Sequence, residues 1–99
     1  MIPTGVRLRM IDAIEAALVA EAAHRKERTV DEWVAAERHA VAVEANKWAA
    51  AHGGATVTVD DVEAVEGGAC GHIDYGRKLA LYVAELVYDK ARVAAQGRP

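Results

Sequence analysis

Apolar side chains recur at three- and four-residue intervals along almost the whole chain, and this spacing restricts the possible folds more than any other feature. The pattern is typical of amphipathic helices, because residues three and four apart share one helix face. It runs through 99 residues that include 22 alanines and 13 valines, enough for one hydrophobic core. The sequence therefore predicts a small all-α bundle, with residues 1–95 forming a single helical domain and residues 96–99 a frayed tail.

The first helix is expected at about residues 5–27, with Thr4 as its N-cap. The charged run from His24 to Arg28 then sets cations at the negative end of the helix dipole. We interpret this run as a solvated helix end rather than a nucleic-acid patch. The apolar stripe of the helix consists of Met10, Ile11, Ile14, Ala17, Leu18 and Ala22.

Thr29 and Glu32 match a capping box, in which each side chain accepts a hydrogen bond from the backbone N–H of the other residue. The second helix is expected to run from there to about Ala51 or His52, where the Gly53-Gly54 pair supplies left-handed backbone. Its core stripe is Val30, Val34, Val41, Ala45 and Trp48, and a neighbouring face holds Trp33, Ala36, Ala40 and Val43. This apolar arc is wider than one core contact requires.

The segment 55–59 alternates like a β-strand but has no partner strand. We therefore expect Thr58 to cap a short third helix over residues 59–66, with Val57 and Val62 as a hydrophobic staple. Several glycines then break this helix, and Asp74 is expected to cap a fourth. The apolar face of the fourth helix comprises Tyr75, Leu79, Tyr82, Val83, Leu86, Val87 and Val93. The bundle thus has three long helices and one short one.

Composition excludes several classes of function. The chain has no serine, so serine-nucleophile catalysis is absent, and its net charge of −3 creates no general attraction to nucleic acid or anionic lipid. The single cysteine, Cys70, cannot form an intramolecular disulfide, and the first four residues lack a signal-peptide pattern. No uncharged run approaches the length of a membrane span. We expect a cytoplasmic protein with no enzyme activity, metal or cofactor.

Two groups of side chains resemble parts of metal sites. Cys70 and His72 supply at most two of the four ligands that zinc requires, so a buried cysteine beside a helix end is the preferred interpretation. Glu21 and His24 have the i, i+3 spacing of carboxylate-bridged di-metal bundles, and a twofold dimer would hold this pair twice. They lie among surface-type residues, which favours an exposed pair. A dimeric metal-binding helical bundle remains an alternative.

The third helix, the glycines and the fourth helix also fit a helix-turn-helix protein. In that interpretation Tyr75, Arg77 and Lys78 begin the recognition helix. The preceding helix carries four acidic residues, which the DNA backbone would repel. DNA binding is therefore kept as a second alternative, and nucleic acid is not the expected partner.

A homodimer built on the second helix, with help from the fourth, is the expected form of the chain. Ala36, Ala40 and Ala45 allow close backbone approach. Trp33 supplies a central anchor, because tryptophan is enriched at interface hot spots. Glu37 interrupts the apolar arc, so we expect it at the rim of the bundle, or else paired with a cation across an interface. Trp48 is assigned to the core. The predicted interface residues are Trp33, Ala36, Glu37, Ala40, Val43 and Tyr82.

Two segments carry a resemblance to known sequences. Residues 56–63 (TVTVDDVE) and 71–87 (GHIDYGRKLALYVAELV) resemble small uncharacterised proteins encoded by actinobacteria and their bacteriophages. The resemblance brings no catalytic or binding residue with it. It implies a small accessory protein that binds another macromolecule, such as a host or phage protein. The resulting prediction is a non-catalytic helical protein–protein interaction module.

Overall fold

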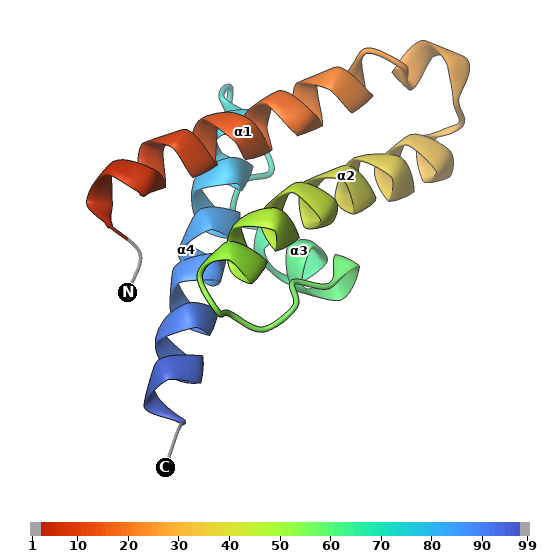
Figure 1. Ribbon diagram of the computed structural model, residues 1–99. Helices are drawn as coiled ribbons and strands as arrows, with labels where there is room; N and C mark the ends of the chain where they lie inside the picture. The colour runs from red at the N-terminus through yellow and green to blue at the C-terminus, as the bar shows by residue number, and fades with distance from the viewer. Residues whose placement is uncertain (1–2, 98–99) are drawn as a thin grey trace.

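The computed structural model describes residues 3–97, and this part of the chain is all-helical. Its elements are α1 (Thr4–Ala22), a 3-10 turn (Arg25–Glu27), α2 (Val30–Ala51), α3 (Val59–Glu66) and α4 (Tyr75–Gln96). The helices α1 and α2 lie side by side and antiparallel, while α4 crosses behind both and α3 packs against α2 and α4 (Figure 1). The predicted bundle of three long helices and one short helix is confirmed for these residues.

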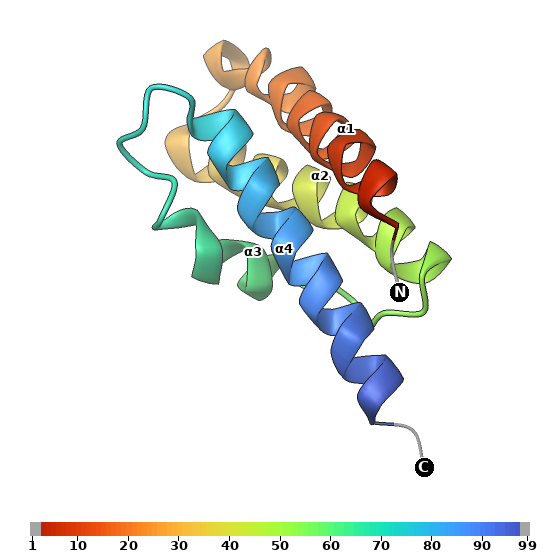
Figure 2. The same cartoon turned by 90° about the vertical axis from the view of Figure 1, so that its left-hand side faces the viewer.

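The core forms where α4 crosses the α1–α2 pair. Its fully buried larger side chains are Met10, Ile14, Val41, Val57, Val62, Leu79, Val83 and Val87. The last turns of α4 continue past the other helices (Figure 2). For this reason Val93, which we expected on the core face, is 61% exposed, and Ala91 packs against the core instead. No helix within residues 3–97 has both the length and the apolar character needed to cross a bilayer.

The first helix is shorter than expected and begins differently. Its N-cap is Pro3, whose extended backbone (ψ 147°) directs its carbonyl oxygen to the N–H of Val6 at 3.0 Å, so Thr4 is already helical and does not cap. At the other end α1 stops at Ala22, and the predicted last turn becomes the separate 3-10 turn. This turn brings Arg25 to α2, which a continued straight helix would not do.

Both ends of α2 have the capping features that the sequence predicted. Thr29 Oγ1 accepts from the N–H of Glu32 at 3.2 Å, and the Glu32 carboxylate accepts from the N–H of Thr29 at 2.8 Å. At the C-terminal end Gly53 has a positive φ of 74°, and Gly54 N–H donates to the Ala49 carbonyl at 2.8 Å. The left-handed backbone predicted at the diglycine is therefore confirmed at Gly53, and the Gly54 bond to Ala49 is the 6→1 hydrogen bond of a Schellman motif. One expected core residue, Val30, is 64% exposed because the first turn of α2 extends beyond the core.

The segment between α2 and α3 is held by a side chain that the sequence did not reveal. The Asn46 amide donates to the Val57 carbonyl at 2.8 Å and accepts from the Val57 N–H at 2.7 Å. Asn46 thus takes the place of a partner strand, and Val57 is buried as the predicted staple requires. Thr58 caps α3 as predicted and forms a full capping box with Asp61.

Three further expectations need correction. Asp74 precedes α4 but its side chain makes no capping hydrogen bond, since its backbone (φ −104°, ψ 41°) departs from the extended N-cap geometry. Trp48 is only half-buried against the core, with its indole N–H 3.3 Å from a carboxylate oxygen of Glu44. Gln96 belongs to α4 rather than to a frayed tail, and the last two positions of the predicted tail lie outside the described residues.

Candidate interaction surface

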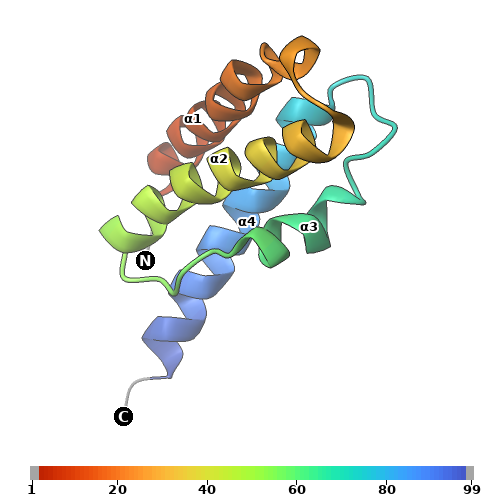
Figure 3. The same ribbon diagram turned by 90° about the vertical axis from the view of Figure 1, so that its right-hand side faces the viewer.

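Three of the predicted interface residues follow one another along a single helix. Ala36 and Ala40 are half-buried and Val43 is 45% exposed. Their spacing of four and three residues puts them on one side of α2, away from the buried position Val41. Ala45, which we also expected to allow close approach of a second copy, is fully buried in the core instead. Figure 3 shows α2 at the outside of the bundle, with α4 behind it. The structure therefore gathers these residues on an outer face of α2.

Glu37 does not lie at the rim. It is only 5% exposed, and its two carboxylate oxygens accept hydrogen bonds from Nε and an Nη of Arg25 at 2.7 and 2.5 Å. The cation that a buried carboxylate requires therefore comes from the same chain, through the 3-10 turn, and not from across an interface. Arg25 lies twelve positions before Glu37 and outside α2, so the periodicity of the helix could not identify it as the partner of Glu37.

The remaining two predicted interface residues lie elsewhere. Trp33 lies beneath the Arg25 guanidinium, whose carbon is 4.1 Å from the centre of the ring system. It lines an open cleft of about 410 Å³ between the start of α2, the turn after α1 and the start of α4. Tyr82 lies in a shallow hollow between α3 and α4, close against Gly68. The structure thus separates Tyr82 from the α2 residues.

Charges around the cleft neutralise one another in pairs. Beside the Arg25–Glu37 pair, Arg38 Nε lies 3.1 Å from both carboxylate oxygens of Glu66, linking α2 to α3. These hydrogen bonds raise the pKa of both arginines. Burial raises the pKa of Tyr75, with the Glu66 charge adding to it, so the phenol stays protonated. The cleft therefore offers a partner mainly aromatic and aliphatic surface.

The residues considered for metal binding do not assemble. Cys70 is exposed, not buried as we expected, because the glycine-rich segment between α3 and α4 runs over the surface. Glu21 accepts from Arg28 at 2.7 Å, which lowers the Glu21 pKa, and His24 Nδ1 lies 3.3 Å from Glu27. In the part of the chain that the structure describes, no three His, Cys, Asp or Glu side chains form a group able to hold a metal ion.

The proposed recognition helix is also engaged within the bundle. Arg77 donates to Asp12 at 2.5 Å and to Glu15 at 3.2 Å, both on α1. Tyr75 lines the cleft. Eight residues separate α3 from α4, whereas a helix-turn-helix uses a turn of about three or four. Two of the three residues, Tyr75 and Arg77, are therefore engaged within the bundle.

Sequence reasoning missed the polar members of the outer face of α2. Glu32, His39 and Lys47 are exposed and alternate along the helix with Ala36 and Val43. We call these five residues the α2 outer row. At about 100° per residue they lie within an arc of about 80°. Their spacing of four, three, four and four residues is the signal in the sequence, but only two of the five residues are apolar, so a search for apolar periodicity does not find the row.

The chain can also be compared with known protein families, proteins and structures. No family model, curated protein or solved structure matches this chain. Its function must therefore be argued from its own surface and chemistry.

Proposed function

We propose that the chain is a non-catalytic helical protein–protein interaction module that self-associates as a homodimer through α2. The observation that carries this proposal is the outer face of α2, where Ala36, Ala40 and Val43 follow one another at the surface of a helix whose opposite side forms the core. The exposed apolar side chains on this outer side gain free energy when a second surface covers them. A second copy is always available to supply that surface.

Trp33 extends the same surface toward the cleft. Its ring is half-buried and is held by the Arg25 guanidinium, so little side-chain freedom remains to be lost on binding. Preorganised aromatic side chains beside apolar hollows are frequent anchors of protein interfaces. In this proposal the cleft receives apolar side chains of a partner protein, such as a host or phage protein, in addition to the second copy on α2. The proposed cytoplasmic location rests on the single cysteine and not on the fold.

Sedimentation equilibrium tests self-association. The wild-type protein should show a concentration-dependent rise in mass from one chain toward two, because a contact made by one helix lies at the small end of protein interfaces. A constant monomer mass up to high micromolar concentration would contradict the homodimer. In that case a pull-down from the native host tests the remaining part of the proposal, which is binding to a different protein.

The two tryptophans provide a matched pair of variants. Trp33→Ala should weaken association by about 2 kcal/mol if Trp33 is an anchor. Trp48→Ala should mainly lower the midpoint of thermal unfolding, since Trp48 packs against the core. The expected cost is about 2–3 kcal/mol, below that of a fully buried tryptophan. Equal effects of both variants on association would remove the anchor role of Trp33.

A further inference from the structure

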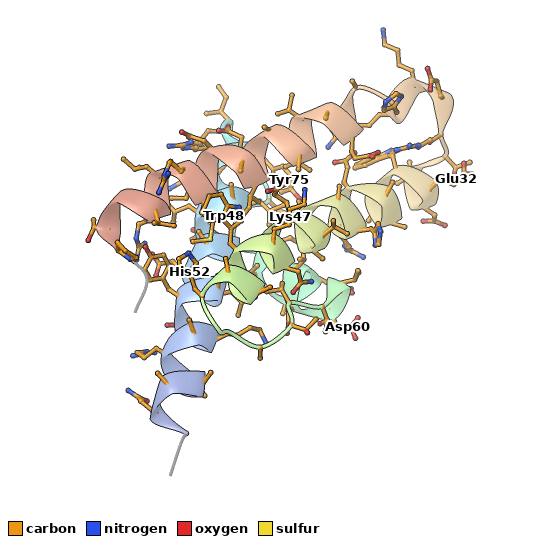
Figure 4. All side chains as sticks on the ribbon, viewed as in Figure 1. Glu32, Lys47, Trp48, His52, Asp60 and Tyr75 are labelled. Carbon is orange, nitrogen blue, oxygen red and sulfur yellow. The ribbon has the colours of Figure 1, made fainter. Side chains whose placement is uncertain are left out.

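The α2 outer row has a charge pattern that is complementary to itself when the helix direction is reversed. Glu32 lies in the first turn of α2 and Lys47 in its C-terminal part (Figure 4). At a rise of 1.5 Å per residue, the two positions are about 22 Å apart along the helix axis. Both side chains are exposed. Glu32 accepts a hydrogen bond from the Thr29 backbone and Lys47 donates to Glu44, so both contacts stay within α2 and its N-cap. Each remains open to solvent on the outer side of the helix.

We infer that two copies of the chain pair through the α2 outer row in an antiparallel, twofold arrangement centred between His39 and Ala40. This inference rests on the proposed homodimer and specifies its geometry. In that register, Glu32 of one copy faces Lys47 of the second copy, and the symmetry forms this ion pair twice. Ala36 then faces Val43 of the second copy, so that a small side chain accommodates a larger one. His39 packs beside Ala40 at the twofold axis.

A parallel pairing of the same faces is disfavoured by charge. It would bring Glu32 against Glu32 and Lys47 against Lys47, and like charges held close together repel. The antiparallel arrangement also sets the positive end of each helix dipole beside the negative end of the other. Trp33 lies further round α2 toward α1, where its ring meets the second copy beside the α2 outer row.

Disulfide cross-linking distinguishes these geometries, because a disulfide requires Cα atoms within about 7 Å. The variants are Ala36→Cys and Val43→Cys, each made in a Cys70→Ala background so that the exposed natural cysteine cannot react. One variant carries a tag, so that the mixed dimer has its own mass on a non-reducing gel. Ala64→Cys, at an exposed position on α3, is the matched control.

In the antiparallel register, an equal mixture of the Ala36→Cys and Val43→Cys proteins should form the mixed disulfide at least tenfold faster than either variant forms a disulfide with itself. Faster self-linking of each variant would overturn the inference in favour of a parallel pair. Rates no higher than those of the Ala64→Cys control would show that this face is not the interface.

Sedimentation of the Cys70→Ala protein in the same buffer separates the two levels of failure. If it is a dimer but the mixture does not cross-link, only the antiparallel geometry fails. If it is a monomer, the proposed homodimer fails as well. A second measurement uses charge: Lys47→Glu should raise the dissociation constant about tenfold at low salt by converting two attractive pairs into repulsive ones. Lys26→Glu, on the exposed turn after α1, should leave it unchanged, and equal effects of the two variants would count against the predicted pairing.

Discussion

The inner and outer faces of α2 are built from similar residues and have opposite surroundings. Val41 and Ala45 on the inner face are fully buried, whereas Val43 on the outer face is 45% exposed. Both faces also contain a glutamate. The inner Glu37 is held by Arg25, and the outer Glu32 closes a capping box. Residue type therefore does not decide which side of α2 is core; the positions of α1, α3 and α4 around this helix decide it.

The largest expected effect comes from removing the cation on the inner face. Arg25→Ala leaves the Glu37 carboxylate buried without its partner, and we expect a loss of about 2–3 kcal/mol in the free energy of unfolding, measured by urea denaturation. The upper range for buried pairs is not reached because the Arg25 side chain is 41% exposed. Replacing both partners, with Arg25→Met and Glu37→Met, should recover much of this loss. Lys26→Ala is the control, and an equal loss in that variant would show that Glu37 does not depend on Arg25.

Val41 and Val43, separated by one residue, allow the two faces of α2 to be compared directly by their contributions to stability. Val41→Ala should cost about 2 kcal/mol, because it removes buried methyl groups and leaves a cavity. Val43→Ala should change the stability of the monomer by less than about 0.5 kcal/mol, and its effect should appear in association instead. Thermal unfolding at low protein concentration and sedimentation at high concentration report the two quantities. Similar losses of monomer stability in the Val41→Ala and Val43→Ala variants would contradict the difference between the two faces.

The smallest expected effect is the loss of folding stability at acid pH. Hydrogen bonds from the Thr29 backbone lower the pKa of Glu32 below its ordinary 4.5, and those from Thr58 lower the pKa of Asp61 below its ordinary 3.8. Because the folded carboxylates bind protons less readily than the unfolded ones, their stabilisation is complete above the ordinary values and is lost as pH falls through the lowered ones. The unfolding midpoint should therefore fall as the solution is acidified below about pH 4.5.

Glu32→Gln isolates the contribution of the outer face to this acid dependence. Glutamine retains an acceptor for the Thr29 N–H but does not titrate in this range. As the pH falls below the ordinary pKa of Glu32, the variant should lose less stability than the wild type does. Identical pH profiles for the two proteins would mean that the capping carboxylate does not contribute to acid unfolding.

The sequence by itself determined the helical character and several helix boundaries. Thr29 with Glu32, Thr58 before α3 and Gly53 after α2 were all found in their predicted roles. Each of these signals acts through hydrogen bonds or backbone angles within a few residues, so no knowledge of the rest of the fold is needed to interpret it. The early end of α1 was missed because the charges after Ala22 fit a helix end equally well one turn later.

Only the tertiary structure decided which charged and polar groups meet. It brought Arg25 to Glu37, Asn46 to Val57 and Arg77 to Asp12, and it placed Cys70 at the surface. It also divided the apolar arc of α2 into a covered side and an open side. The first two contacts depend on how the chain turns between neighbouring helices, whereas Arg77 meets Asp12 across 65 positions. Which side of α2 is covered depends on the angle at which α4 crosses the α1–α2 pair (Figure 1). The hydrophobic spacing of one helix contains no information about that angle, because burial is a property of the neighbours as much as of the residue.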